Sequence, residues 1–161
     1  MLNKLEAFAR RMELIQPGDT VVCAVSGGAD SMALLFAMYL LKEKLGEDFL
    51  LLCGDVIFDI DVKRFYEFHK ACGGVATLFT HPNSHPYDSG IIMADDAGKV
   101  TNWLHKEEPR LWYRNRVNAG LHFFSHKIFE QGLFQELKKV DLDREVLKPL
   151  IPTGQLFVYD S

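Results

Sequence analysis

Residues 26–31 read Ser-Gly-Gly-Ala-Asp-Ser, a combination of residue types that can bind phosphate. An apolar, β-branched run at 20–25 precedes them, and a run at 31–45 without glycine or proline follows. The predicted order is therefore strand, loop and helix. Backbone N–H groups at a helix start attract anions, and glycines allow close approach. The alternative is a turn whose glycines serve geometry only. The candidate phosphate-binding residues are Ser26, Gly27, Gly28, Ala29, Asp30 and Ser31.

Asp55 is the second candidate, because it follows the apolar run at 48–53 and Gly54. In open α/β sheets, ligands gather at the carboxyl ends of the strands. A carboxylate at that edge can hold a magnesium ion that bridges nucleotide phosphates. The alternative is an ordinary turn aspartate. Asp59 and Asp61 follow at a spacing of two, and helix capping is the preferred interpretation for them, Asp61 especially.

A basic cluster lies between residues 106 and 116 and contains Lys106, Arg110, Arg114 and Arg116. Cations at this density can neutralise the phosphates of a nucleotide during phosphoryl transfer. The alternative is a solvated loop face, which is the default interpretation of such a cluster when no motif accompanies it.

Composition limits the classes of protein to consider. The chain has 161 residues, of which 48% are hydrophobic and 25% charged, as in one ordinary globular domain. A net charge of -4 argues against a surface that coats DNA. No apolar run is long enough for a membrane span, and the charged N-terminus does not resemble a signal peptide. These features predict a cytoplasmic protein that binds neither membrane nor DNA.

Strands and helices alternate over the first 80 residues, which predicts an α/β fold with a layered, Rossmann-like sheet. The later half has more strands, so the sheet is expected to be parallel at first, mixed later, and incomplete. The runs at 21–25 and 50–53 are predicted to be adjacent parallel strands joined by a crossover through 31–45. The other predicted elements are a helix at 61–74, two strands around a turn within 91–104, and strands at 75–80, 117–125 and 155–160.

Residues 1–45, with "VVCAVSGGADSMALL" at their centre, resemble the N-terminus of a PP-loop ATPase of the tRNA(Ile)-lysidine synthetase type. The resemblance implies ATP phosphate binding by residues 26–31. Only under the lysidine synthetase interpretation would tRNA be a partner. The segment that would bind tRNA in such a synthetase is absent from this sequence.

Residues 47–161 resemble the middle of a sugar-1-phosphate nucleotidyltransferase of the heptose or mannose 1-phosphate guanylyltransferase type. The matching stretches include "FLLLCGDVIFDID", "HPYDSG", "GKVTNWLHKEEP" and "YRNRVNAGLHFFS". The resemblance implies Asp55 as a ligand of Mg²⁺ and Lys106 as the partner of the sugar phosphate. It places Tyr87, Asp88 and Ser89 on a loop facing the nucleotide-sugar cleft. It places Asn118, Ala119 and Gly120 in the sugar pocket.

The two resemblances predict a chimera joined within residues 38–49. A PP-loop-like segment at 1–46 and a nucleotidyltransferase-like segment at 47–161 would form one compact unit. The leading function is synthesis of a nucleotide-sugar from a sugar 1-phosphate and an NTP, preferably GTP rather than ATP. The family's usual Gly-rich NTP loop has no counterpart in the sequence. A truncated form is therefore expected, with its activity left open. The alternatives are a lysidine synthetase fragment, a non-functional hybrid, and a simple nucleotide-binding module.

Overall fold

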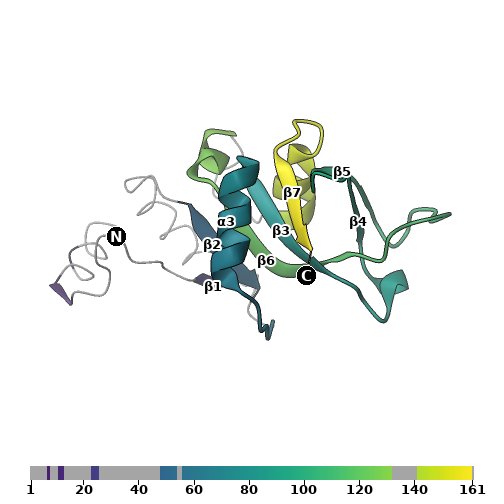
Figure 1. Ribbon diagram of the computed structural model, residues 1–161, viewed down its shortest axis with the longest axis horizontal. Coiled ribbons are helices and arrows are strands. Elements are labelled where there is room, and N and C mark those ends of the chain that lie inside the picture. Colours follow the sequence, from purple (N-terminus) through teal and green to yellow (C-terminus); the bar gives the residue numbers. More distant parts are fainter. Residues whose placement is uncertain are drawn as a thin grey trace.

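The computed structural model describes residues 7, 11–12, 23–25, 48–53, 56–131 and 141–160. Within these residues seven strands form one open mixed sheet, in which the strands follow the order β1-β2-β6-β3-β7 and β4 pairs with both β5 and β6 (Figure 1). The strands are β1 (Cys23–Val25), β2 (Phe49–Cys53), β3 (Ala76–His81), β4 (Ile91–Ala94), β5 (Val100–Leu104), β6 (Val117–Phe124) and β7 (Leu156–Asp160). The helical elements are α3 (Val62–Cys72), η1 (Pro86–Asp88), η2 (His126–Gln131), η3 (Leu142–Leu147) and η4 (Lys148–Leu150).

The pairing of β1 with β2 is parallel, as predicted, and places Val25 opposite Cys53. The two strands therefore end at the same edge of the sheet. The long strand β6 then lies antiparallel between β2 and β3, and β7 pairs with β3 in parallel. The sheet is thus parallel at first and mixed later, and β3 is not the neighbour of β2.

Helix α3 has sequence signals at both ends. The Asp61 carboxylate accepts a hydrogen bond from the N–H of Arg64 at 2.9 Å, which confirms Asp61 as the N-cap. At the other end Gly73 adopts a left-handed conformation with φ of 66°. Phe65, on the side of α3 that faces the sheet, is fully buried and has edge-to-face contacts with Phe79 and Phe123.

The two faces of the sheet follow the two-residue period of its strands. Leu50 and Leu52 of β2 pack on the α3 side, together with Leu121 and Phe123 of β6. Figure 1 shows α3 lying across this face. This face therefore forms one of the two hydrophobic clusters, with Phe65 at its centre.

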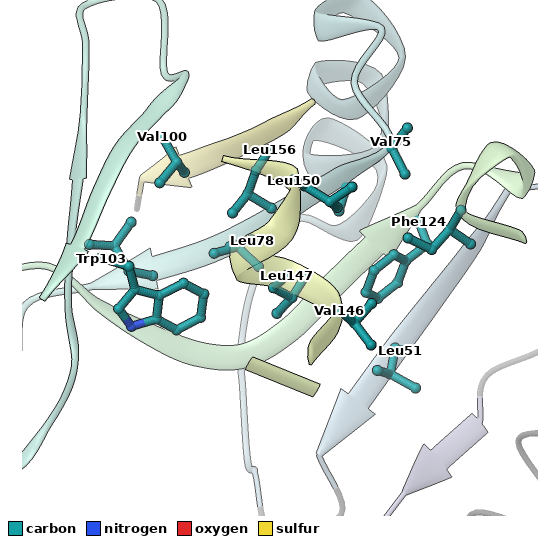
Figure 2. Packing of buried hydrophobic residues seen from close by; sticks show 13 residues of the cluster. Leu51, Val75, Leu78, Val100, Trp103, Phe124, Val146, Leu147, Leu150 and Leu156 are labelled. Carbon is teal, nitrogen blue, oxygen red and sulfur yellow. The ribbon is translucent and has the colours of Figure 1, made fainter. Parts of the chain in front are cut away.

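The opposite face carries Leu51 of β2 and Phe124 of β6, and η3 and η4 cover it with Val146, Leu147 and Leu150. Figure 2 shows these side chains packed together, with Trp103 of β5 closing the far end of the cluster. Each fully buried aliphatic side chain of this kind contributes about 1.5–3 kcal/mol to folding. The cluster therefore fixes η3 over β6.

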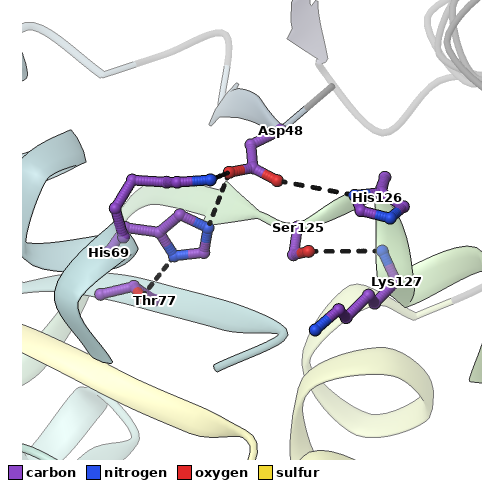
Figure 3. Close-up of polar contacts among 7 residues, drawn as sticks. Asp48, His69, Thr77, Ser125, His126 and Lys127 are labelled. Carbon is purple, nitrogen blue, oxygen red and sulfur yellow. Dashed lines mark hydrogen bonds and ion pairs between the residues drawn. The ribbon is translucent and has the colours of Figure 1, made fainter. Parts of the chain in front are cut away.

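A polar cluster lies near the start of β2 and joins four segments of the chain (Figure 3). The Asp48 carboxylate is within 3.0 Å of the Lys70 ammonium and 3.9 Å of the His126 ring. His69 lies 4.0 Å from Asp48, and its Nδ1 makes a 2.7 Å hydrogen bond with the Thr77 hydroxyl. His69 and Thr77 are both buried. This cluster ties β2, α3, β3 and η2 together.

A candidate binding cleft between β6 and η3

A cleft of about 560 Å³ opens between β6 and η3, beside the end of β2. It brings together four residues that the sequence selects, namely Ser89, Asn118, Ala119 and Gly120. The remaining lining residues are Cys53, Val56, Gly90, Trp103, His105, Val117, His122, Asp141, Leu142 and Asp143. Its wall is thus mixed, with apolar surface and a few polar groups, as in small-molecule sites.

Strand β6 is irregular where it borders the cleft. Leu78 of β3 pairs with His122, whereas Thr80 pairs with Asn118, so β6 carries extra residues between these two pairs. Gly120 lies in this bulge with φ of 76°. A Cβ on Gly120 would lie 3.0 Å from Val56 Cγ2 and 3.1 Å from Cys53 Cβ. Bulges of this kind re-aim side chains beside binding sites, and only glycine fits this position without strain.

The Asn118 side chain is held by its own strand. Its Oδ1 accepts the backbone N–H of Gly120 at 3.0 Å and lies 2.9 Å from His122 Nε2. Within the described part of the chain, Asn118 Nδ2 has no hydrogen-bond partner. Asn118 therefore offers an amide donor to the cleft.

His122 is fully buried in the wall of the cleft. Burial lowers the pKa of the ring to about 3, so the imidazole is neutral near pH 7. The sequence interpretation missed His122, because a histidine within "VNAGLHFF" is indistinguishable from a core residue by its position alone.

Two aspartates from η3 and its N-cap face β6 across the cleft, and the sequence pattern missed them as well. Asp141 caps η3, accepting the N–H of Arg144 at 3.0 Å, and its own N–H donates to Glu145 at 2.9 Å. Asp143 is half-buried. Its pKa is raised first by burial and then by the charge of Asp141, while His105 and Lys148 act in the opposite direction. Asp143 is thus a partly desolvated hydrogen-bond acceptor.

The loop before β4 forms the rim that carries Ser89. Arg110 donates from Nη1 to the Pro86 carbonyl at 2.6 Å and from Nη2 to the Ser89 carbonyl at 2.5 Å. The Asn83 amide donates to the Ser89 hydroxyl at 2.8 Å. The other two loop residues selected from the sequence, Tyr87 and Asp88, are exposed and do not line the cleft.

Lys106 is exposed on a turn next to His105, which lines the cleft. The Glu108 N–H donates to the His105 carbonyl at 3.1 Å, and the Glu108 carboxylate accepts the His105 N–H. The hydrogen bond from the His105 N–H to the Glu108 carboxylate is the main cause of the lowered pKa of Glu108. The closed turn positions Lys106 beside the cleft without placing its ammonium inside it.

The basic cluster does not act as one phosphate-binding surface. Arg114 pairs with Asp160 at 3.1 Å, and Arg116 pairs with the other oxygen of the same carboxylate. Arg110 binds loop carbonyls. These arginines join the loop before β6 to β7 and to the rim of the cleft, and Lys106 is the member whose exposed charge remains for a ligand.

The predicted phosphate-binding residues 26–31 and Asp55 lie outside the described residues. The strands that precede them, β1 and β2, end in register at Val25 and Cys53. Cys53 itself lines the cleft. In the described ranges, no group of three histidine, cysteine or acidic side chains is arranged to hold a metal ion.

A family model described as "Nucleotidyl transferase" matches residues 9–159. The chain is 28% identical over 160 residues to mannose-1-phosphate guanylyltransferase 1 of Arabidopsis thaliana, which covers 96% of this chain and 41% of that protein. It is 30% identical over 125 residues to mannose-1-phosphate guanyltransferase of Saccharomyces cerevisiae, covering 73% of this chain and 34% of that one. A crystal structure from Bacillus anthracis, assigned as a glucose-1-phosphate thymidylyltransferase, matches with a TM-score of 0.57 and 18% identity, covering 78% of this chain and 51% of that chain.

The chain therefore belongs to the nucleotidyl transferase family, and the structural match shows that the fold is shared. It spans about two fifths of the length of the curated plant relatives it matches. The family match runs through the junction expected within residues 38–49. These comparisons give no support to the tRNA(Ile)-lysidine synthetase resemblance of residues 1–45 or to a chimera. No helix among the described residues is long and apolar enough to cross a bilayer.

Proposed function

We propose that this chain binds a sugar 1-phosphate in the cleft between β6 and η3, and that it takes part in making a nucleotide-sugar from it. A phosphate oxygen of the sugar 1-phosphate attacks the α-phosphorus of an NTP. The bond between that phosphorus and the oxygen bridging to the β-phosphorus breaks, and pyrophosphate leaves. Such a reaction needs positioning and charge neutralisation rather than a protein nucleophile.

The observation that carries the proposal is the meeting of Asn118, Ala119, Gly120 and Ser89 at one cleft. The amide donor of Asn118 and the half-buried acceptor Asp143 face the same space. A sugar presents both hydroxyl donors and oxygen acceptors, so this pairing of groups suits it. Lys106, on the adjacent turn, is the candidate partner of the sugar phosphate.

Asp55 is the candidate ligand of Mg²⁺, which would neutralise charge on the nucleotide phosphates when bound. In the sequence, Asp55 lies between Cys53 and Val56, which both line the cleft. A carboxylate at this place, beyond a strand end and beside a polar cleft, suits an oxygen-ligated cation. Ser26–Ser31 are the candidate phosphate contacts, because β1 ends opposite Cys53.

Mannose 1-phosphate or heptose 1-phosphate with GTP is the favoured substrate pair, since guanylyltransferases for mannose 1-phosphate are among the relatives. The test is release of pyrophosphate from GTP by the full chain with each sugar phosphate and Mg²⁺. ATP and UTP serve as competitors. Binding of GTP without release would support a nucleotide-binding module, and absence of both binding and release would contradict the proposal.

The metal role is tested with Asp55→Ala, which should abolish Mg²⁺-dependent release. Asp59→Ala is the matched control, because Asp59 is an exposed aspartate on the same segment. Release that survives Asp55→Ala would rule out Asp55 as the ligand. Gly28→Val should weaken GTP binding in titration calorimetry by blocking close approach of phosphate, with little effect on sugar 1-phosphate binding. Equal affinity for GTP in this variant would exclude the loop as a phosphate site.

A further inference from the structure

The hydrogen bonds around Asn118 fix the proton on the His122 ring. The backbone N–H of Gly120 can only donate, so the Asn118 side-chain atom 3.0 Å away must be the oxygen. That oxygen also lies 2.9 Å from His122 Nε2 and can only accept, so Nε2 must carry the proton. His122 is therefore the Nε2–H tautomer, and its Nδ1 is a bare acceptor.

The surroundings of the ring favour this state alone. Among the described residues, His122 Nδ1 is a buried side-chain atom without a hydrogen-bond partner. Protonating Nδ1 would add an unpaired donor and a charge to a fully buried site. Burial lowers the pKa of the His122 ring to about 3, which agrees with a neutral imidazole. The ring thus donates steadily from Nε2 over the physiological pH range.

Two donors converge on Asn118 Oδ1, from Gly120 and His122. A flipped carboxamide would place its NH₂ group against both of them and lose both hydrogen bonds. The oxygen is therefore turned inward to the strand. The NH₂ group remains for the cleft, which Asn118 lines.

We propose that His122 is a positioning residue for substrate binding: it holds the Asn118 carboxamide so that Nδ2 donates to an oxygen of the bound sugar 1-phosphate. This inference rests on the proposed function and adds a residue to it. His122 does not touch the reacting atoms. It acts through Asn118, together with the backbone N–H of Gly120.

The test compares His122→Leu with His122→Gln. Leucine fills much of the ring volume but has no donor, whereas the glutamine amide reaches about as far as Nε2 and keeps one. We expect the Kd of the full chain for mannose 1-phosphate, measured by calorimetry, to rise about five- to twenty-fold in His122→Leu. His122→Gln should restore most of that loss. His122→Asn, whose amide reaches only the Nδ1 position, should not.

Leu78→Ala is the control for general destabilisation. Leu78 pairs with His122 across the sheet and is fully buried, but it makes no hydrogen bond to the cleft. It should lower the melting temperature and leave the Kd unchanged. Asn118→Ala should weaken binding as His122→Leu does, and the double variant should be no weaker than Asn118→Ala alone, because both changes remove one donor.

Two readouts separate this inference from the proposed function. If the wild-type chain binds mannose 1-phosphate and His122→Leu binds it equally well, the inference is overturned while the proposed function stands. The same conclusion follows if His122→Gln weakens binding as much as His122→Leu does. If the wild-type chain binds no sugar 1-phosphate, the proposed function and the substrate contact fail together. The hydrogen bond from His122 Nε2 to Asn118 is then tested by ¹⁵N NMR of the histidine ring. An unprotonated Nε2 overturns it, and a protonated Nε2 upholds it.

The pH profile gives a further check. Sugar 1-phosphate binding by the wild type and by His122→Gln should follow the same profile between about pH 5 and 8, because the ring does not titrate there. A limb of the profile that disappears in His122→Gln would show a titrating His122 and contradict the proposal.

Discussion

Arg110 binds the carbonyl oxygen of Ser89 through Nη2 at 2.5 Å, and the same guanidinium binds the Pro86 carbonyl through Nη1 at 2.6 Å. One side chain thus fixes two points of the loop that forms the rim of the cleft. The two carbonyls belong to an exposed loop, so without Arg110 the rim would depend on Asn83 and Asn115, which link the loop to the segment before β6.

Replacing Arg110 with lysine should loosen the rim, because a lysine ammonium cannot hold two carbonyls in the fixed geometry of a guanidinium. We expect the affinity for mannose 1-phosphate to fall about three- to ten-fold and proteolysis within residues 84–90 to accelerate. Arg114→Lys is the control, because that exposed arginine pairs with Asp160 instead. Equal behaviour of the two variants would show that the bidentate contact has no effect on binding.

Gly120→Ala should destabilise the fold more than Gly73→Ala. Both glycines have positive φ, 76° and 66°. The left-handed conformation alone costs a non-glycine residue about 1–2 kcal/mol. A Cβ at Gly73 meets nothing within 4 Å, whereas one at Gly120 crowds Val56 and Cys53. We expect Gly120→Ala to cost about 1–3 kcal/mol more in the free energy of unfolding from crowding, measured by denaturant titration. Equal costs would show that β6 moves aside freely.

Asp143 should make the fold less stable as pH rises. Its pKa in the folded chain lies above its ordinary value of 3.8, first because of burial and then because of Asp141. Between the unfolded and folded pKa values the native state binds more protons, so its stability falls through that window and stays reduced above it. Asp143→Asn should therefore raise the free energy of unfolding near pH 7 and have little effect at pH values below 3.8.

Asp141→Asn is the companion variant for that titration. Asparagine caps a helix as well as aspartate does, so η3 should keep its start. Losing the charge of Asp141 should bring the pKa of Asp143 closer to its ordinary value, as followed by carboxyl ¹³C NMR. A stability curve for Asp143→Asn that parallels the wild type from acid to neutral pH would exclude the burial effect.

The local elements of this fold could be predicted from the sequence, because their signals are short. Asp61 and Gly73 mark the ends of α3, and apolar runs mark β2 and β3. The insertion of β6 between β2 and β3 could not be predicted, because no local signal in β2 specifies a partner strand about 70 residues later in the sequence. Asn118 and Gly120 were found through a motif shared with a family.

The rest of the site depends on tertiary contacts. Asp143 belongs to no motif in the sequence, and the packing of Val146 and Leu147 places it beside β6. The functional character of His122 comes from its burial and from the bulge that brings Asn118 Oδ1 to its ring. Arg114 and Arg116 are a basic pair in the sequence, and Asp160 of β7, 46 residues after Arg114, neutralises them.

Thr77→Val should lower stability without affecting the cleft. The Thr77 hydroxyl makes a 2.7 Å hydrogen bond with His69 Nδ1, and both residues are buried. Valine matches threonine in shape but removes the hydroxyl that bonds the ring nitrogen, which costs about 1–3 kcal/mol in the free energy of unfolding. Thr77 does not line the cleft, and its hydroxyl bonds His69 of α3 on the face of the sheet opposite η3, so the Kd for mannose 1-phosphate should not change. Thr101→Val, the same substitution at an exposed position of β5, should change the free energy of unfolding by no more than about 0.5 kcal/mol. If the two variants unfold alike in urea, the buried hydrogen bond adds nothing to stability.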